Sequence, residues 1–351
     1  MAIPGQNGIL RRARLEIAAT ALALAGLALI LIHNFGGGGE ATLVNVSYDP
    51  TREFYAALNP LFQAERERQS GRKVTIQQSH GGSSRQARKV IAGEQRADVV
   101  TLALPSDVDS LAKRGLIDAK WPERLPNHST PYTSTIVFVV RGGNPHAIKD
   151  WPDLVAPGVE IVTPDPRTSG NGKLAALAAW ASVVTRNGSD GVAKAFLKAL
   201  YAHTTGELAE GARGAATAFL QTDAGDVHLT WENEALREVA ESKGKLTVVY
   251  PPVSILAEPS VAWVDASLKD SDRLADAKAY LNFLYSEAGQ QLAARYGYRP
   301  LNPESARKAG VNFADIRLIP IGTIAHDWAE ANQKFFAENG VIDSVLGGAR
   351  R

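Results

Sequence analysis

Strand-like runs that alternate with helix-forming stretches constrain this chain more than any other feature of its sequence. Runs with many β-branched residues and aromatics lie at residues 42–48, 73–78, 97–104, 134–140, 159–164, 226–231 and 245–252. Amphipathic segments with helical periodicity lie between several of them, which predicts an α/β fold with mainly parallel sheets. In open sheets of this kind ligands bind beyond the carboxyl ends of the strands, so the strand-to-helix loops are the expected site.

Several of these loops contain residue patterns that are typical of helix N-termini. Asp49-Pro50 has the form of an N-cap followed by a first-turn proline, and Ser83-Ser-Arg-Gln86 has the form of a capping box. Ser169-Gly-Asn-Gly172 precedes "KLAALAAWASVV", and Gly211-Ala-Arg-Gly214 precedes "AATAFLQ". The first turn of a helix leaves backbone N–H groups unpaired and carries about half a positive charge. An anion is therefore the expected guest.

The N-terminus has the pattern of an export signal. Arg11, Arg12 and Arg14 precede an apolar run over residues 17–32, and a glycine run follows it. The run is slightly short for a membrane span, and Gly39-Glu40-Ala41 offers a small-residue cleavage site. We expect residues 1–41 to be a signal peptide, with an uncleaved anchor as the alternative.

The composition excludes several classes of site. The chain has 351 residues and no cysteine, which rules out disulfides, thiolate metal sites and a cysteine nucleophile. Residues 1–41 hold three of the 38 basic and two of the 37 acidic residues, so the remaining body carries 35 of each. A formally neutral body lacks the basic footprint of a nucleic-acid-binding protein.

The loop "QSHGGSSRQ" (78–86) also suggests an enzyme. Its His80-Gly-Gly segment resembles the oxyanion loop of lipase-like hydrolases, and Ser83 and His80 could act together as a serine hydrolase pair. No G-x-S-x-G elbow occurs in the chain, so this alternative has little support.

Other motifs fail on their spacing. Gly170-Asn-Gly-Lys173 resembles part of a phosphate loop, but Arg167 and Leu174 replace residues that the full motif needs. A relaxed dinucleotide fingerprint at Gly170 lacks the second strand with a ribose-binding acid. The seven histidines are scattered, which argues against zinc. Glu232 and Glu234 are expected to be first-turn helix carboxylates and not a catalytic pair.

Blocks along nearly the whole chain resemble one known family. They are "LVNVSYDPTREFY", "QSHGGSSRQ", "ADVVTLALPSDVD", "RLPNHSTPYTSTIVFVVRGGNP", "TPDPRTSGNGKLAALAAW", "EGARGAATAF", "TWENEAL" and "ILAEPSV". In order and spacing they are similar to the periplasmic sulfate-binding proteins of bacterial ABC importers, over residues 42–340. The resemblance implies a two-lobed type II periplasmic-binding-protein fold of α/β class, with the ligand in a cleft between the lobes.

The same resemblance implies how the chain divides into lobes. Residues 42–132 with 258–351 would form lobe one, and 133–257 lobe two. The chain would cross between the lobes near Tyr132–Thr135 and Leu256–Pro259. Sulfate is the implied ligand, with thiosulfate or molybdate as alternatives. The implied partner is a membrane permease, and we expect a monomer without a cofactor or metal.

By resemblance, neutral hydrogen-bond donors would hold the dianion. The implied donors are the backbone N–H groups of Asp49, Ser83, Gly170, Asn171 and Ala212, the hydroxyl of Ser169 and the indole N–H of Trp231. The Asp49 side chain would cap its loop. Asn171 stands where relatives have glycine, but a backbone donor survives that change.

Four more residues are expected beside these donors. Gly81 and Gly82 would let the chain approach an anion closely, and His80 would support the loop. Arg213, like Arg85, is expected to pair with a nearby Asp or Glu and not with the anion itself. Because indole and peptide N–H groups donate but cannot accept, such a ring favours a fully deprotonated anion over hydrogen phosphate.

Overall fold

The computed structural model describes residues 41–347, and these residues form two compact units. The smaller unit, within the described part, consists of residues 41–42 and 63–75, where the Ala41 N–H donates to the Lys73 carbonyl at 3.0 Å. The larger unit comprises residues 43–62 and 76–347. The predicted export signal lies almost wholly outside the described residues.

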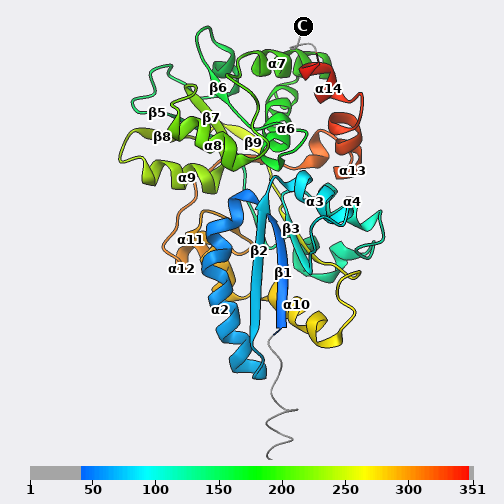
Figure 1. Cartoon of the computed structure of the whole chain (residues 1–351). Coiled ribbons are helices and arrows are strands. Elements are labelled where there is room, and N and C mark those ends of the chain that lie inside the picture. Colours follow the sequence, from blue (N-terminus) through cyan, green and yellow to red (C-terminus); the bar gives the residue numbers. More distant parts are fainter. Residues whose placement is uncertain (1–40, 348–351) are drawn as a thin grey trace, which may run out of the picture. The chain divides into compact units, whose positions relative to one another are not determined.

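Two four-stranded sheets form the framework of the larger unit (Figure 1). The first has the strand order β10-β3-β1-β2, and the second has the order β6-β7-β5-β8. The strands of the first sheet are β1 (Ala41–Tyr48), β2 (Val74–Gly81), β3 (Val99–Leu102) and β10 (Ser260–Trp263). Those of the second are β5 (Ile136–Arg141), β6 (Ile161–Val162), β7 (Val227–Trp231) and β8 (Leu246–Val249).

The sheets are less parallel than the sequence predicted. Strands β1 and β3 pair in parallel, as do β6 and β7, but β10 runs antiparallel to β3 and β5 runs antiparallel to both its neighbours. Alternation of strand-like and helix-like segments indicates that crossovers exist, but it does not specify which strands become neighbours. The expectation of mainly parallel sheets was therefore wrong for the centre of the second sheet.

Helices cover both sheets. They are α2 (Arg52–Ser70), α3 (Ser83–Ile91), α4 (Pro105–Ala112), α5 (Pro126–Ser129), α6 (Gly170–Val184), α7 (Asp190–Ala202), α8 (Ala212–Gln221), α9 (Glu232–Glu241), α10 (Ser271–Phe283), α11 (Glu287–Arg295), α12 (Pro303–Lys308), α13 (Trp328–Ala331) and α14 (Val341–Leu346). Short helical turns include η1 (Asp49–Thr51) and η5 (Asn332–Phe336). None of the helices within residues 41–347 has both the length and the apolar character needed to cross a membrane.

Each sheet has its own apolar core. In the first, Val46, Val100 and Leu102 pack against α3 and α4. In the second, Val137, Val139 and Phe219 form the centre of a cluster between strands and α8. Helix α6 is buried from Gly170 to Ser182, as expected of a helix that is apolar all around.

The segments where the chain was predicted to cross between lobes lie side by side. Ser134 and Ala257 exchange backbone hydrogen bonds of 3.0 and 2.9 Å, and the Thr135 hydroxyl donates to the Ile255 carbonyl at 2.8 Å. Nearby, β4 (Tyr132–Thr133) pairs with β11 (Arg299–Pro300), and β9 (Val253–Ile255) pairs with β12 (Arg317–Ile319).

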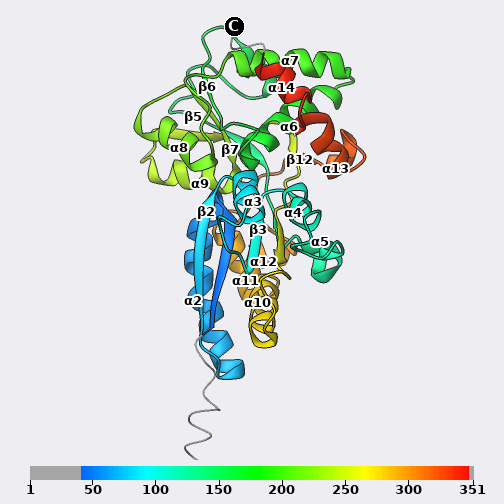
Figure 2. The same cartoon turned by 45° about the vertical axis from the view of Figure 1, so that its right-hand side comes forward.

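The C-terminal helices pack on the helices of the second sheet. Helix α14 contacts α7, and Phe335 of η5 meets Trp180 of α6 edge-on, with ring centroids 4.9 Å apart. Lys334 forms an ion pair of 2.8 Å with Asp190 at the start of α7. Both views of the chain show α14 next to α7 (Figures 1 and 2).

Candidate functional site

The starts of η1, α3 and α8, and the loop before α6, meet around two glycines. A methyl group added to Gly82 would lie 2.8 Å from the carbonyl oxygens of both Thr168 and Glu210. A methyl group on Gly211 would collide with the Asp49 carboxylate and lie 3.4 Å from the Gly82 nitrogen. At position 82 neighbouring backbone occupies the space of a side chain, so only glycine fits, whereas at position 211 the Asp49 side chain occupies that space.

The start of α6 packs equally closely on the start of α3. A methyl group on Gly170, the first residue of α6, would collide with the Ala103 side chain and lie 3.3 Å from the Ser83 Cβ. The two helix starts therefore face each other at van der Waals distance.

The predicted backbone donors occupy the first turns of these helices. Ser83 is the first residue of α3, Gly170 and Asn171 are the first two of α6, and Ala212 is the first of α8. N–H groups at such positions have no acceptor within their own helix. The structure thus brings these donors together, and their role in binding an anion stays a prediction.

Ser169 is the N-cap of α6. It is buried, and its hydroxyl oxygen accepts from the Gly172 N–H at 3.4 Å. This contact leaves the Ser169 hydroxyl hydrogen available to another acceptor.

Trp231 ends β7 and is fully buried. Its indole N–H has no hydrogen-bond partner among the described residues. The Trp231 ring lies 5.2 Å from the ring of Tyr48, which precedes Asp49, and the Asn171 side-chain amide donates to the Leu229 carbonyl at 2.9 Å. Because an unpaired buried donor costs about 1–3 kcal/mol, this indole N–H would be stabilised by an acceptor.

Asp49 differs from its predicted role as an N-cap. Tyr48 is the N-cap of η1, and Asp49 is the first residue of that turn. Its carboxylate lies beside Gly211 at the start of α8, where the backbone N–H of Arg213 helps to lower its pKa. Burial raises the pKa of Asp49, while Arg52, Arg213 and Arg85 lower it in part.

Ser83 also differs from its predicted role, because no capping box forms at α3. Gly82 is the N-cap and makes no side-chain bond. The Ser83 hydroxyl donates to Asp107 at 2.6 Å and accepts from the Ala103 N–H at 2.9 Å. The Gln86 amide turns instead to the Ser79 hydroxyl, at 3.2 Å.

His80 does not contact Ser83. Its Nδ1 lies 2.8 Å from the Ser47 hydroxyl, and burial together with Arg52 lowers its pKa to about 4. At neutral pH the ring is therefore uncharged. Gly81 packs against the Gln86 side chain, since a methyl group there would lie 3.3 Å from the Gln86 Cδ.

Arg213 and Arg85 pair with acids, as the sequence predicted. Arg213 donates to Glu53 at 2.6 Å, and Arg85 pairs with Glu210. Both arginines thus have carboxylate partners beside the convergent helix starts.

Sequence reasoning missed Asp107, near the start of α4. The buried Asp107 carboxylate accepts from the hydroxyls of Ser83 and Ser84 at 2.6 and 2.8 Å, and Lys173 of α6 approaches it to 3.3 Å. An acid after the proline that follows a predicted strand was the available signal.

The acids of α9 have structural partners. Glu232 and Glu234 lie in its first turn, as predicted. Glu232 receives two hydrogen bonds from Arg299, at 2.6 and 2.8 Å, and Glu234 pairs with Arg237 at 2.8 Å. Within residues 41–347 there is no group of three or more His, Asp or Glu side chains placed to hold a metal ion.

Comparisons with known proteins agree with the resemblance found in the sequence. The sulfate-binding protein of Salmonella typhimurium is 45% identical over 322 residues, which cover 91% of this chain and 97% of that protein. The thiosulfate-binding protein of Pseudomonas aeruginosa is 44% identical over 328 residues, covering 92% and 96%. Among solved structures, the sulfate-binding protein SubI from Mycobacterium tuberculosis matches with a TM-score of 0.76 and 29% identity, covering 85% of this chain and 100% of that one.

The expected fold is confirmed, by this structure and by a family model, as the mixed α/β fold of periplasmic solute-binding proteins. The family model of bacterial extracellular solute-binding proteins matches residues 43–299. The chain belongs to this family, and within it to the group that includes the sulfate-binding and thiosulfate-binding proteins.

Proposed function

We propose that this protein is an exported receptor that binds sulfate and delivers it to the membrane permease of an ABC importer. Relatives that span nearly the whole chain are sulfate-binding and thiosulfate-binding proteins. The observation that carries the proposal is the buried Trp231 indole N–H, which has no partner among the described residues. The first turns of η1, α3, α6 and α8 supply further donors of the same kind.

The bound dianion would take hydrogen bonds from neutral donors. The proposed donors are the backbone N–H groups of Asp49, Ser83, Gly170, Asn171 and Ala212, the Ser169 hydroxyl and the Trp231 indole. Helix dipoles and polarised peptides would stabilise the charge, since Arg213 and Arg85 already have carboxylate partners. Such a site can release its ligand, whereas a desolvated direct ion pair is costly to break.

The donor chemistry favours sulfate over phosphate. At neutral pH, sulfate offers only acceptors, whereas hydrogen phosphate carries an O–H that would face another donor. A donor facing a donor in a buried site costs about 1–3 kcal/mol, which corresponds to about five- to 150-fold discrimination. Thiosulfate also lacks a proton and is the main alternative ligand. Molybdate is a further alternative of the same tetrahedral class.

We retain the two lobes as part of the proposal, with one revision. Lobe one would include the first sheet, and lobe two the second. Because β12 pairs with β9 and α14 packs on α7, we assign residues 317–347 to lobe two and not to lobe one. The chain would then cross a third time between Arg299 and Arg317.

We also propose that the protein catalyses no reaction. The hydrolase alternative needs Ser83 to donate to His80, but the Ser83 hydroxyl donates to Asp107 and His80 contacts Ser47. The protein would act as a monomer outside the cytoplasm, either released by cleavage near residue 41 or held by its N-terminal segment.

Tryptophan fluorescence tests this function. Micromolar sulfate should change the emission of the wild-type protein at pH 7, and phosphate should leave it unchanged. Trp231→Phe should lose most of the signal, which separates Trp231 from the five other tryptophans. A wild-type protein that responds to no sulfur oxyanion would refute the proposal. Esterase activity abolished by Ser83→Ala would establish the hydrolase alternative instead.

A further inference from the structure

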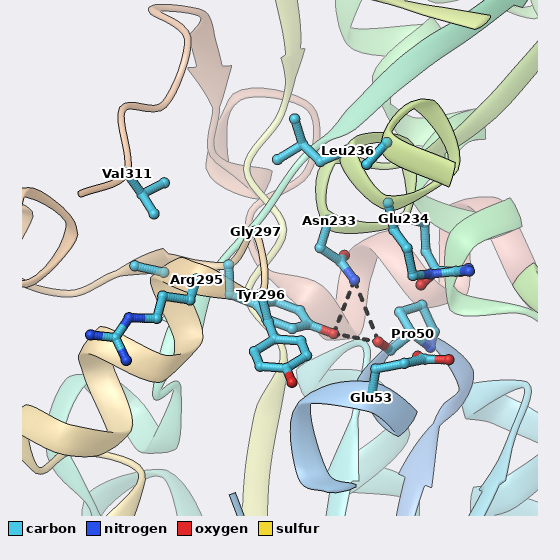
Figure 3. A pocket seen from close by; sticks show the side chains of 13 residues that line it. Pro50, Glu53, Asn233, Glu234, Leu236, Arg295, Tyr296, Gly297 and Val311 are labelled. Carbon is cyan, nitrogen blue, oxygen red and sulfur yellow. Dashed lines mark hydrogen bonds and ion pairs between the residues drawn. The ribbon is translucent and has the colours of Figure 1, made fainter. Parts of the chain in front are cut away.

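A second cavity lies next to the proposed anion site. It has a volume of about 440 Å³ and lies between η1, α9 and the turn that joins α11 to β11 (Figure 3). We call it the α9 cavity. Its size falls in the usual range for small-molecule sites, about 300–1,000 Å³.

The wall of the α9 cavity is continuous with the proposed anion site. Pro50 follows Asp49, and Asn233 lies two residues beyond Trp231; both line the cavity. The Tyr298 hydroxyl donates to the Pro50 carbonyl at 2.8 Å, and the Asn233 amide reaches the same carbonyl at 3.4 Å and the Tyr298 hydroxyl at 3.2 Å (Figure 3). Two short segments, 49–50 and 231–233, thus each contain a predicted sulfate donor and a residue that lines the cavity.

The turn that closes the cavity is fitted closely to α9. Gly297 has a φ of +78°, and a methyl group there would lie 2.8 Å from the Asn233 Cα. Glycine is required at this position both by the left-handed backbone and by the close approach.

Much of the lining of the α9 cavity is apolar. Leu236 remains 38% exposed, and Ala240, Ala294 and Val311 contribute further hydrocarbon surface, with the ring of Tyr296 beside them. Two carboxylates in the lining already have cationic partners, because Glu53 pairs with Arg213 and Glu234 pairs with Arg237.

One charged side chain of the lining has no ion-pair partner among the described residues, and its charge is positive. Arg295, at the end of α11, is exposed and makes no ion pair with another described residue. Its side chain extends to the outer side of the cavity (Figure 3). A guest with a hydrocarbon body and one anionic group would match both the apolar wall and the arginine at the rim.

We propose that the α9 cavity is an effector site for a small amphipathic organic anion, such as an aryl or alkyl carboxylate or sulfonate. The guest would contact η1, which follows a strand of the first sheet, and α9, which follows a strand of the second. A guest that touches both walls stabilises the state in which Pro50 and Asn233 are in contact. In that state the predicted sulfate donors on the same segments are also together, so occupancy of the cavity raises sulfate affinity.

The coupling part of this inference rests on the proposed function, but binding of the guest does not. By linkage, sulfate must raise the affinity for the guest by the same factor. The two parts can therefore be measured apart.

The probe is 8-anilinonaphthalene-1-sulfonate, which has an apolar body and one sulfonate and fluoresces in apolar surroundings. It is titrated into the purified wild-type protein and three variants, with and without saturating sulfate. Ala240→Phe fills the cavity from an exposed position, and Arg295→Gln removes the rim charge. Ala202→Phe places the same bulk at an exposed position on α7 and serves as the matched control.

We expect one dye per chain in the wild type and in Ala202→Phe, with at least tenfold weaker binding in Ala240→Phe. Arg295→Gln should weaken dye binding about two- to fivefold, as for an exposed charge pair. Saturating sulfate should tighten the dye about fivefold or more in the wild type.

Equal dye binding by Ala240→Phe and Ala202→Phe would overturn the site, as would displacement of the dye by sulfate. Dye binding that is blocked by Ala240→Phe but indifferent to sulfate, in a protein that calorimetry shows to bind sulfate, would overturn the coupling. A protein that binds the dye in the cavity and never binds sulfate would refute the proposed function and leave the cavity site standing.

Discussion

At the scale of single residues, Ser83 and Asp49 each lie against a segment that is distant in the sequence, Ser83 at Asp107 and Asp49 at Gly211. Ser83 was correctly expected at a helix start, but its hydroxyl serves Asp107 and Ala103 and not a capping box. Asp49 was expected to cap its own turn, but Tyr48 is the N-cap and the Asp49 carboxylate lies beside Gly211 at the start of α8. Local patterns report helix starts because caps act within a few residues. They cannot report a partner that folding brings from a distant segment.

Trp231 leads to the most direct prediction at this scale. Trp231→Phe keeps most of the ring volume and removes one donor to the anion. Because a hydrogen bond to a charged group contributes about 1.5–3 kcal/mol, sulfate affinity should fall roughly tenfold or more, without loss of thermal stability.

Trp180 supplies the matched control for this prediction. It is also buried, and its indole N–H also has no partner among the described residues, but it packs against Phe335. Titration calorimetry should show unchanged sulfate affinity for Trp180→Phe. Equal losses in the two variants would mean that Trp231 does not contact the anion.

Because the Asp49 carboxyl group is buried near the proposed site, we expect sulfate binding to depend on pH. Its pKa is raised, chiefly by burial, so its carboxylate becomes protonated at a higher pH than an ordinary aspartate. Burial makes the charged form of Asp49 less stable than the neutral form. The folded state therefore loses stability as the pH rises through the raised pKa. A neutral Asp49 also repels the sulfate dianion less.

Asp49→Asn keeps the backbone N–H and the size of the side chain, but removes the charge. It should bind sulfate roughly fivefold more tightly than the wild type at pH 7 and low ionic strength. The wild type should gain affinity as the pH falls towards the raised pKa of Asp49, and the variant should gain less. Identical pH profiles measured by calorimetry would contradict this role of the carboxylate.

At the scale of elements, the helix starts were the predictable part and the strand pairing was not. The starts of α3, α6 and α8 lie where serine and glycine predicted them. Strand β10 was missed because its four residues make a weak pattern, although its antiparallel pairing with β3 closes the first sheet. Strand direction depends on distant pairing, which no local window contains.

A substitution at Gly211 tests how closely the starts of η1 and α8 must approach each other. Gly211→Ala would place a methyl group against the Asp49 carboxylate, so that either this carboxylate or the whole of η1 must move away from α8. Because Asp49 and Ala212 are both proposed donors, we expect sulfate affinity to fall at least tenfold.

The control is Gly191→Ala at the second position of α7, where the nearest atom would be the Ser189 hydroxyl oxygen at 3.7 Å. That variant should bind sulfate normally and gain about 0.4–1 kcal/mol of stability. Normal sulfate binding by Gly211→Ala, measured in the same titrations, would show that the approach of η1 to α8 is not needed.

At the scale of the whole chain, the fold followed from the resemblance and not from periodicity. An α/β class could be inferred from the alternation of segments, but it fits many folds. The position of residues 317–347 could not be inferred, because an apolar stripe such as that around Phe335 does not say which helix it meets. The convergence of helix starts from segments around residues 49, 83, 170 and 212 likewise depends on tertiary packing.

One calorimetric titration of the wild-type protein at pH 7 tests the central claim most directly. Sulfate, thiosulfate, molybdate and phosphate are injected separately into the same preparation. The site described above predicts one sulfate per chain with micromolar or tighter affinity, and phosphate weaker by at least about fivefold. Equal affinity for phosphate, or no heat with any sulfur oxyanion, would contradict a ring of neutral donors selecting a fully deprotonated anion.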